Sequence, residues 1–225
     1  MATVTLRTRT LVLALAATAI TGMGARGLIA SPQTPPRPTV ATAARTPGPR
    51  STTVGMPTGF ARNEPGAIAA ATSYVRQGQH LFDLPAADRI PALQAIVSRD
   101  GANSYVAQVS AGLADLDGIE AHGQGHLTWD VSVLATRVDA YNDQRVRISI
   151  WRVGVLSVTG LIAPLAEWTT VDDELVWERG DWKVWAETQT PGPTPAGHPD
   201  ARPSTPTQLQ AALAGYTRYP GPDPL

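Results

Sequence analysis

Three consecutive carboxylates, Asp172, Asp173 and Glu174, form a cluster of acid groups in this sequence. Neighbouring side chains of a β-strand point to opposite faces, so Asp172 and Glu174 would share one face and Asp173 would lie on the other. Carboxylates of this kind transfer protons only where an apolar pocket and a partner donor surround them. The interpretation that we favour from the sequence is an exposed, acidic start of a strand. By the same alternation, Asp130 lies on a polar, exposed face.

Two histidines, His122 and His126, are four residues apart, a spacing that can chelate a metal on a helix. Gly123 and Gly125 would break such a helix, so solvated loop histidines are the favoured interpretation. The glycine-rich stretch 118–125 precedes a strand rather than a helix, which argues against a phosphate-binding loop. No Ser-His-Asp arrangement or dinucleotide fingerprint stands out. We therefore expect no catalytic residue, no metal and no cofactor.

All six tryptophans lie between Trp129 and Trp185. Alternation places three of them toward the expected helices, namely Trp129, Trp177 and Trp182. The other three, which would lie near one another on the opposite face of the sheet, are Trp151, Trp168 and Trp185. Exposed tryptophan on the back of a sheet indicates a surface that something covers. We expect these three residues to form a binding surface for a protein partner, a second subunit or the chain's own tail.

Hydrophobic periodicity predicts three helices followed by four strands. The helices are expected at 63–78, 88–98 and 103–117, and the strands at 127–133, 145–150, 168–178 and 182–186. Turns are expected at 141–144 and 179–181. This order predicts an α+β fold in which the N-terminal helices pack on one face of a curved four-stranded antiparallel sheet.

The prolines predict where the folded domain begins and ends. Of 20 prolines, 7 lie in residues 31–57 and 9 in residues 191–225. Because proline fixes φ and removes a backbone donor, dense proline opposes both helix and sheet. We expect one folded domain at 58–190 between two disordered arms, a linker at 31–57 and a tail at 191–225. Within the tail, a proline, an N-cap and an apolar stripe predict a short helix at 206–214.

The N-terminal residues 1–30 resemble a membrane segment. Arg7 and Arg9 precede an apolar run, Leu11–Ala25, that Arg26 interrupts before it continues to Ala30. We favour an uncleaved anchor over a cleaved signal peptide, because neither candidate cleavage site has a small residue three positions before it. A buried helix of a soluble protein is the remaining alternative. The positive-inside rule then places the domain on the extracytoplasmic side of a single-pass membrane protein; cleavage would make it secreted.

Charge and cysteine content exclude several classes of function. Cysteine is absent, which rules out disulfides, a thiolate metal site and a cysteine nucleophile. Residues 58–190 carry 17 acidic and 10 basic side chains. Since phosphate contacts supply most of the affinity for nucleic acids, such an acidic domain is a poor nucleic-acid binder.

The closing hairpin, residues 175–184, resembles the last two strands of the nuclear-transport-factor-two-like superfamily, a cone of helices on a curved sheet. Three pieces of the sequence resemble an uncharacterised domain family of high-GC bacteria that is often seen near conjugation genes. They are residues 59–60 with 63–67, residues 150–155, and residues 168–183 with the trailing 191–195. The resemblance implies the cone fold. The order of an anchor, a linker and this fold is also similar to the layout of conjugation and type IV secretion scaffold proteins with their extracytoplasmic domains. Enzymes of the superfamily use buried carboxylates with raised pKa values as bases, which is the alternative role for the acid cluster.

Two functions from different classes follow from these observations. The first is a non-enzymatic, membrane-anchored extracytoplasmic protein that binds other proteins of a cell-envelope or conjugation-type assembly. The alternative is a small-molecule-binding or isomerase/hydratase-like domain that uses the cavity between helices and sheet. That alternative requires a cavity lined by an Asp or His together with a Tyr or Trp donor.

Overall fold

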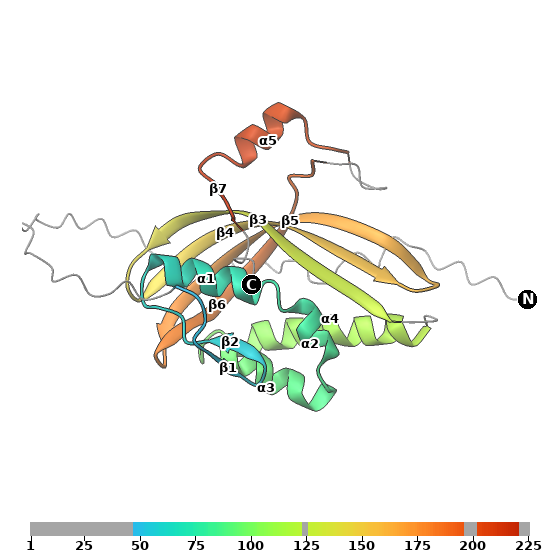
Figure 1. Ribbon diagram of the computed structural model, residues 1–225, viewed down its shortest axis with the longest axis horizontal. Helices are drawn as coiled ribbons and strands as arrows, with labels where there is room; N and C mark the ends of the chain where they lie inside the picture. The colour runs from blue at the N-terminus through green and yellow to red at the C-terminus, as the bar shows by residue number, and fades with distance from the viewer. Residues whose placement is uncertain (1–46, 123–125, 196–201, 221–225) are drawn as a thin grey trace, which may run out of the picture.

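The computed structural model of the protein describes residues 47–122, 126–195 and 202–220. The strands are β1 (Ser51–Thr53), β2 (Met56–Thr58), β3 (Leu127–Tyr141), β4 (Arg145–Val158), β5 (Ile162–Glu178), β6 (Asp181–Pro191) and β7 (Thr217–Arg218). The helices are α1 (Glu64–Tyr74), α2 (Gly78–Asp83), α3 (Ala86–Ile96), α4 (Ala102–His122) and α5 (Pro206–Ala212). Strands β6-β5-β4-β3-β7 form one antiparallel sheet in that order, and β1 and β2 form a separate hairpin. Figure 1 shows α1 to α4 on one face of the sheet and α5 on the other. The α+β layout that the sequence predicts is confirmed.

The first helix begins as its sequence predicts and ends earlier. The side chain of Asn63 accepts a hydrogen bond from the backbone N–H of Gly66 at 2.8 Å, and Pro65 occupies the first turn. Helix α1 stops at Tyr74, and Gly78 starts the short helix α2, which the sequence did not predict. Helix α4 continues past its expected end at residue 117, because a single glycine inside a helix costs only about 1 kcal/mol.

The strands are longer than the alternating patterns that predicted them. Val158 pairs with Ile162, so the β4–β5 hairpin closes around residues 159–161 and β5 begins well before Trp168. Pro164 lies within β5 at a register shift between the two strands. A proline is tolerated there because its missing N–H takes no ladder hydrogen bond away.

The sheet has five strands rather than the expected four, because the tail supplies an edge strand. Thr217 and Arg218 of β7 pair with Thr136 and Ala135 of β3. The backbone N–H of Tyr219 also donates to the carbonyl of Leu134 at 2.9 Å. The expectation of a disordered tail therefore needs correction for its described residues, which are bound to the domain. The helix expected at 206–214 is present as α5, with a capping box formed by Thr205 and Gln208.

The expected linker, residues 31–57, also forms regular structure where it meets the domain. The hairpin β1–β2 covers residues 51–58, which the proline pattern assigns mostly to a linker ending at residue 57. Met56 is fully buried, so this hairpin belongs to the core. The expected membrane segment, residues 1–30, lies outside the described residues. Within the described ranges, no helix combines the length and hydrophobicity that a membrane span requires.

The core lies between the helices and the sheet face that they cover. Trp182 is fully buried near its centre, where its indole N–H donates to the carbonyl of Ala61 at 3.0 Å. The hydroxyl of Tyr74 donates to the carbonyl of Trp182 at 2.8 Å. These bonds connect the hairpin segment, α1 and β6. They fix the distance between the first helix and the far edge of the sheet.

Candidate functional site

A β-bulge in β6 decides which of its side chains face the helices. Glu174 pairs with Ala186 and Leu175 pairs with Val184, so Trp185 is an extra residue on β6. One extra residue reverses the alternation beyond it. Strict alternation would place Ala186 toward the helices, but the bulge instead brings Glu187 and Gln189 there.

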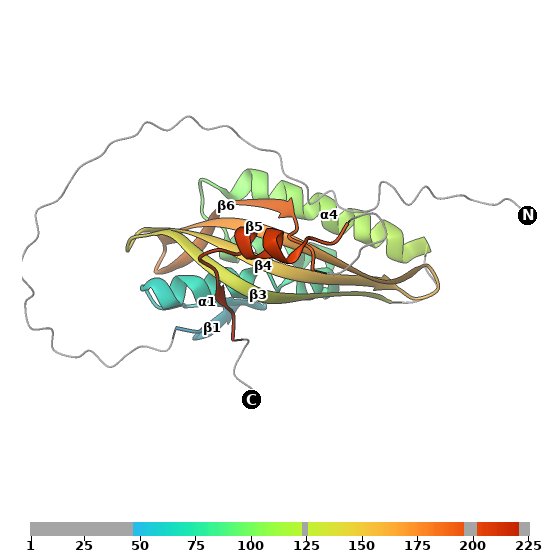
Figure 2. The ribbon, with the colours of Figure 1, turned by 90° about the horizontal axis from the view of Figure 1, so that it is seen from above.

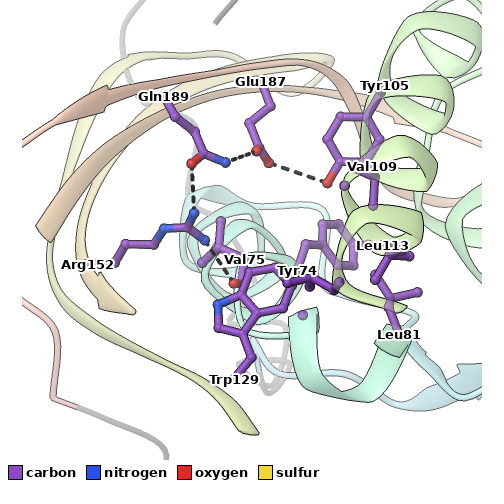
Figure 3. A pocket seen from close by; sticks show the side chains of 13 residues that line it. Tyr74, Val75, Leu81, Tyr105, Val109, Leu113, Trp129, Arg152, Glu187 and Gln189 are labelled. Carbon is purple, nitrogen blue, oxygen red and sulfur yellow. Dashed lines mark hydrogen bonds between the residues drawn. The ribbon is translucent and has the colours of Figure 1, made fainter. Parts of the chain in front are cut away.

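These two residues border a pocket of about 50 Å³ between the helices and the sheet. Helices α1, α2 and α4 form one side of it, and strands β3, β4 and β6 form the other (Figure 3). The lining residues are Tyr74, Val75, Gly78, Leu81, Tyr105, Val109, Gly112, Leu113, Leu116, Trp129, Arg152, Glu187 and Gln189. Most are apolar, and the polar side chains gather at the end where Tyr105, Glu187, Gln189 and Arg152 lie (Figure 3).

A chain of hydrogen bonds joins the polar groups of the pocket. Arg152, only 8% exposed, donates to the carbonyl of Val75 at 3.2 Å, to the hydroxyl of Thr169 at 3.1 Å and to Gln189 Oε1 at 2.9 Å. Gln189 Nε2 donates to Glu187 Oε1 at 2.8 Å. The phenol of Tyr105 donates to Glu187 Oε2 at 3.4 Å. The guanidinium of Arg152 therefore holds the amide of Gln189, which in turn orients the carboxylate of Glu187.

Asp173 lies directly behind this network. It is 2% exposed and is paired in register with Glu187 on the neighbouring strand. Neither of its carboxyl oxygens accepts a hydrogen bond from any described residue. Burial raises the pKa of Asp173 well above its usual value, and the charge of Glu187 raises it further, while Arg152 opposes both effects. Burial and the charge of Glu187 therefore favour the protonated form of Asp173, which lies across the two strands from Glu187.

The same surroundings keep Tyr105 in its neutral form. Burial raises the pKa of its phenol well above the usual value, and the charge of Glu187 adds to that effect. The pocket thus presents a phenol, a carboxylate and a guanidinium at one end, and the buried Asp173 lies behind them. Together the lining groups can hold a polar group by hydrogen bonds.

The acid cluster at 172–174 divides as alternation predicts, but one member has a different environment. Asp172 is exposed on the face away from α1 to α4, where it accepts a hydrogen bond from Ser149. Glu174 lies on that same face and pairs with Arg145 at 2.8 Å. The exposed interpretation is wrong for Asp173, which the helices cover. Asp130 is exposed, as predicted.

Of the two candidate histidines, His126 does not line this pocket, and the side chain of His122 lies outside what the structure describes. His126 lies on the surface, with its Nδ1 3.2 Å from Glu120 and its Nε2 3.9 Å from Asp83. Residues 123–125 lie outside the described residues. In the part of the chain that the structure describes, no group of three or more His, Asp or Glu side chains is arranged to hold a metal ion.

The three tryptophans expected on the back of the sheet occupy two separate places, and all are partly buried. The indole N–H of Trp151 donates to the carbonyl of Pro193 at 2.9 Å. Trp168 lies diagonally across β4 and β5 from Trp151, and its carbonyl accepts a hydrogen bond from the N–H of Gly192. The tail segment at 192–193 thus contacts both residues.

Trp185 lies at the bulge, several residues along the sheet from Trp151. The guanidinium of Arg145 stacks over its ring at 4.7 Å from the centroid. The expected cluster of three tryptophans is therefore not formed, because the bulge and the length of the strands separate Trp185 from the other two.

The chain belongs to the family described as "Domain of unknown function (DUF8175)", which matches residues 35–218. The match includes α5 and β7, so the tail is part of the family's domain. It confirms the resemblance to an uncharacterised domain family, while the association with conjugation genes stays a prediction. Among curated proteins, none matches the sequence.

The chain is similar to solved structures that include the following two. One is the intermembrane space region of the chloroplast protein ARC6, at 15% identity and a TM-score of 0.37, covering 56% of this chain and 93% of that chain. The other is ActVI-ORFA from Streptomyces coelicolor, at 18% identity and a TM-score of 0.41, covering 61% of this chain and 98% of that chain.

Proposed function

We propose that the protein binds a small molecule in the pocket between α1, α2, α4 and the sheet. The observation that carries this proposal is the pairing of Asp173 with Glu187 inside the domain. Two acids and an arginine in a core cost stability relative to apolar side chains of similar size. Titratable groups with strongly perturbed pKa values cluster at functional sites, so a binding role accounts for this cost.

The pocket defines the chemistry of its ligand. Its apolar wall, from Val109 and Leu113 to Trp129, suits a hydrocarbon or ring. Its polar end offers donors from Tyr105 and a carboxylate acceptor from Glu187. A volume of about 50 Å³ admits a few water-sized groups. The ligand is therefore a small neutral molecule, or the end of a larger one, that carries a hydroxyl or carbonyl on an apolar body.

An isomerase or hydratase activity is the enzymatic form of the same proposal. In that form the carboxylate of Glu187 takes a proton from one atom of the bound molecule and returns that proton to another atom, which restores its own charge. The position of Glu187 in the pocket, held by Gln189 and beside the phenol of Tyr105, supports this form.

An NMR fragment screen on the full chain tests binding. Cyclohexanol, cyclohexanone, phenol and benzaldehyde serve as probes at millimolar concentration. We expect shift changes at the Trp129 indole and at Gln189, and their loss in Val109→Phe, which fills the pocket. Thr128→Phe, on the exposed face of β3, is the control for added bulk. The proposal fails if no probe shifts these residues, or if Val109→Phe binds as the unaltered chain does.

The membrane-anchored, protein-binding role in a cell-envelope or conjugation-type assembly also stays a proposal, supported by the sequence of residues 1–57. The nuclear-transport-factor-two-like cone is likewise our proposal for the fold type, supported by helices on one face of an antiparallel sheet. Because the tail contacts Trp151 and Trp168, Trp185 is the best placed of the three tryptophans for a protein partner. Mass spectrometry of the mature amino terminus distinguishes an anchored protein from a secreted one.

A further inference from the structure

A groove of about 760 Å³ lies on the opposite face of the sheet, between the strands and the described parts of the tail. Helix α5 lies over this face (Figure 1 and Figure 2), yet it buries none of its side chains. A helix that merely covered a sheet would bury its apolar stripe against the strands. The volume falls in the range of about 300–1,000 Å³ that is typical of small-molecule sites.

The tail that forms the roof of the groove is attached at both ends. On one side, Pro193 accepts the hydrogen bond from Trp151, and Thr194 and Ser204 bond to each other. On the other side, the guanidinium of Arg137 stacks on the ring of Tyr216 at 4.8 Å, just before β7 joins the sheet. The described parts of the tail that border the groove are therefore attached to the sheet at both margins.

A network of polar side chains lies at the groove, and Arg137 and Asp172 are its members that line the groove. Ser149, 1% exposed, has its hydroxyl in hydrogen-bond contact with Asp139, Asp172 and Arg137. Arg137 also donates to Asp139 at 2.6 Å. Asp172 lines the groove, and its Oδ2 has no hydrogen-bond partner among the described residues. One carboxylate oxygen is thus fixed by Ser149, and the other is available to a ligand.

The charges in the groove exclude most ligand classes. Asp172 disfavours an anion, and Arg137 and Arg202 disfavour a cation. A wholly apolar ligand is also disfavoured. It would displace the water that forms hydrogen bonds with polar lining groups such as the hydroxyl of Thr190 and the amide of Gln208. A neutral molecule with many hydroxyl groups satisfies all of these side chains at once, because each hydroxyl both donates and accepts.

From this arrangement we propose that the groove binds a neutral oligosaccharide. Asp172 accepts hydrogen bonds from its hydroxyls, while Arg137 and Gln208 donate to its oxygens. The ring of Tyr216 and the prolines at 193 and 203 provide apolar surface for the C–H faces of the sugar rings. This site is separate from the inner pocket, since the sheet lies between them, so either proposal can fail without the other.

Titration of the full chain with maltotriose, cellotriose and the trimer of N-acetylglucosamine tests the proposal by NMR. We expect at least one trisaccharide to shift the amide signals of Gln208 and Tyr216 at millimolar concentration and to leave Tyr105 unshifted. Asp172→Ala should weaken binding at least tenfold. Glu174→Ala is the matched control, because Glu174 lies two residues along the same strand and face, where it pairs with Arg145.

A second variant, Gln208→Glu, removes the amide donor but keeps the Oε1 acceptor of the capping box at the start of α5, and it should also weaken binding severalfold. The proposal is overturned if no trisaccharide shifts these residues, or if Asp172→Ala and Gln208→Glu both bind as the unaltered chain does. Binding of a proline-rich peptide such as Pro-Pro-Thr-Pro-Pro in the groove, with no saccharide binding, would also overturn it.

Discussion

Asp173 and Glu187 face each other across β5 and β6, with both side chains on the sheet face that the helices cover. Around them, the titratable groups that contribute to the environment of Asp173 or of the pocket include Tyr105 of α4, Arg152 of β4 and Asp172 of β5. Because burial and Glu187 both raise the pKa of Asp173, its folded state keeps a proton that the unfolded chain loses. This difference has a direct effect on stability.

The first prediction concerns Asp173→Asn and pH. The folded pKa of Asp173 lies above its ordinary value of 3.8, so stability from this group is complete below that value and falls as pH rises toward the folded pKa. Within that window the free energy of unfolding should fall by about 1.4 kcal/mol per pH unit. Asp173→Asn should remove this fall, as measured by urea denaturation from pH 4 to pH 8.

Asp130→Asn is the control for this prediction, because Asp130 is an exposed aspartate of the same sheet. Its pH profile should match that of the unaltered chain. A profile for Asp173→Asn that also matches the unaltered chain would show that Asp173 does not hold a proton in the folded state.

A second prediction concerns the buried carboxylate of Asp181. It accepts hydrogen bonds from the backbone N–H groups of Gly59 and Phe60 and from the ammonium of Lys183, each at 3.0 Å. Lys183 is only 5% exposed, so Asp181→Ala would leave a buried cation without its carboxylate. We expect a loss of about 3–5 kcal/mol in the free energy of unfolding.

Chemical denaturation measures this loss in the free energy of unfolding of Asp181→Ala, with Asp143→Ala as the control variant. Asp143 forms an exposed ion pair with Arg62 at 3.5 Å, and exposed pairs contribute about 1 kcal/mol or less. Equal losses in the two variants would contradict the role given to Asp181.

The third prediction compares two glycines that differ in the space around them. A Cβ added to Gly78 would lie 2.7 Å from the Trp129 ring, whereas one added to Gly118 would meet no atom within 4 Å apart from its chain neighbours and the backbone of its own helix. Gly78→Ala should displace the indole, change its fluorescence and cost about 1–3 kcal/mol. Gly118→Ala, inside α4, should instead add about 0.5–1 kcal/mol of stability. Denaturation with fluorescence detection measures both, and a stabilising Gly78→Ala would refute the contact.

The fourth prediction concerns the attachment of the tail. Trp151→Phe removes the indole N–H that donates to Pro193, a loss of about 1 kcal/mol. The amide protons of Gly192 and Thr194 should then exchange faster with solvent. Trp185→Phe, at the far end of the sheet, should leave their exchange rates unchanged. Unchanged exchange in Trp151→Phe would show that the tail is held by other contacts alone.

Much of the fold could be predicted from the sequence, because local signals determine it. The cap at Asn63, the alternation after Gly125 and the turn at Gly180 each depend on a few neighbouring residues. The edge strand β7 could not be predicted, since two exposed residues, Thr217 and Arg218, carry no periodic pattern. Its position depends on long-range pairing with β3, which the tail sequence alone does not contain.

The candidate site was less accessible to sequence analysis than the fold. The alternating pattern of β4 indicates that Arg152 faces the helices, because Arg152 lies in phase with the buried residues Ile148 and Ile150. The pattern of β6 gives no such indication for Glu187 and Gln189, because the bulge at Trp185 reverses the alternation without a glycine or proline to mark it. The buried position of Asp173 depends on the placement of α4 over the sheet, which is a property of packing rather than of local pattern.

Carbon-13 NMR titration of the side-chain carboxyl groups of Asp173 and Glu187 in the full chain tests the central claim most directly. The account predicts that Asp173 stays protonated well above the ordinary pKa of an aspartic acid, 3.8, and that Glu187→Gln lowers the pKa of Asp173 by removing a neighbouring charge. Titration of Asp173 at that ordinary value would contradict it, because burial and Glu187 would then not perturb the buried carboxyl group.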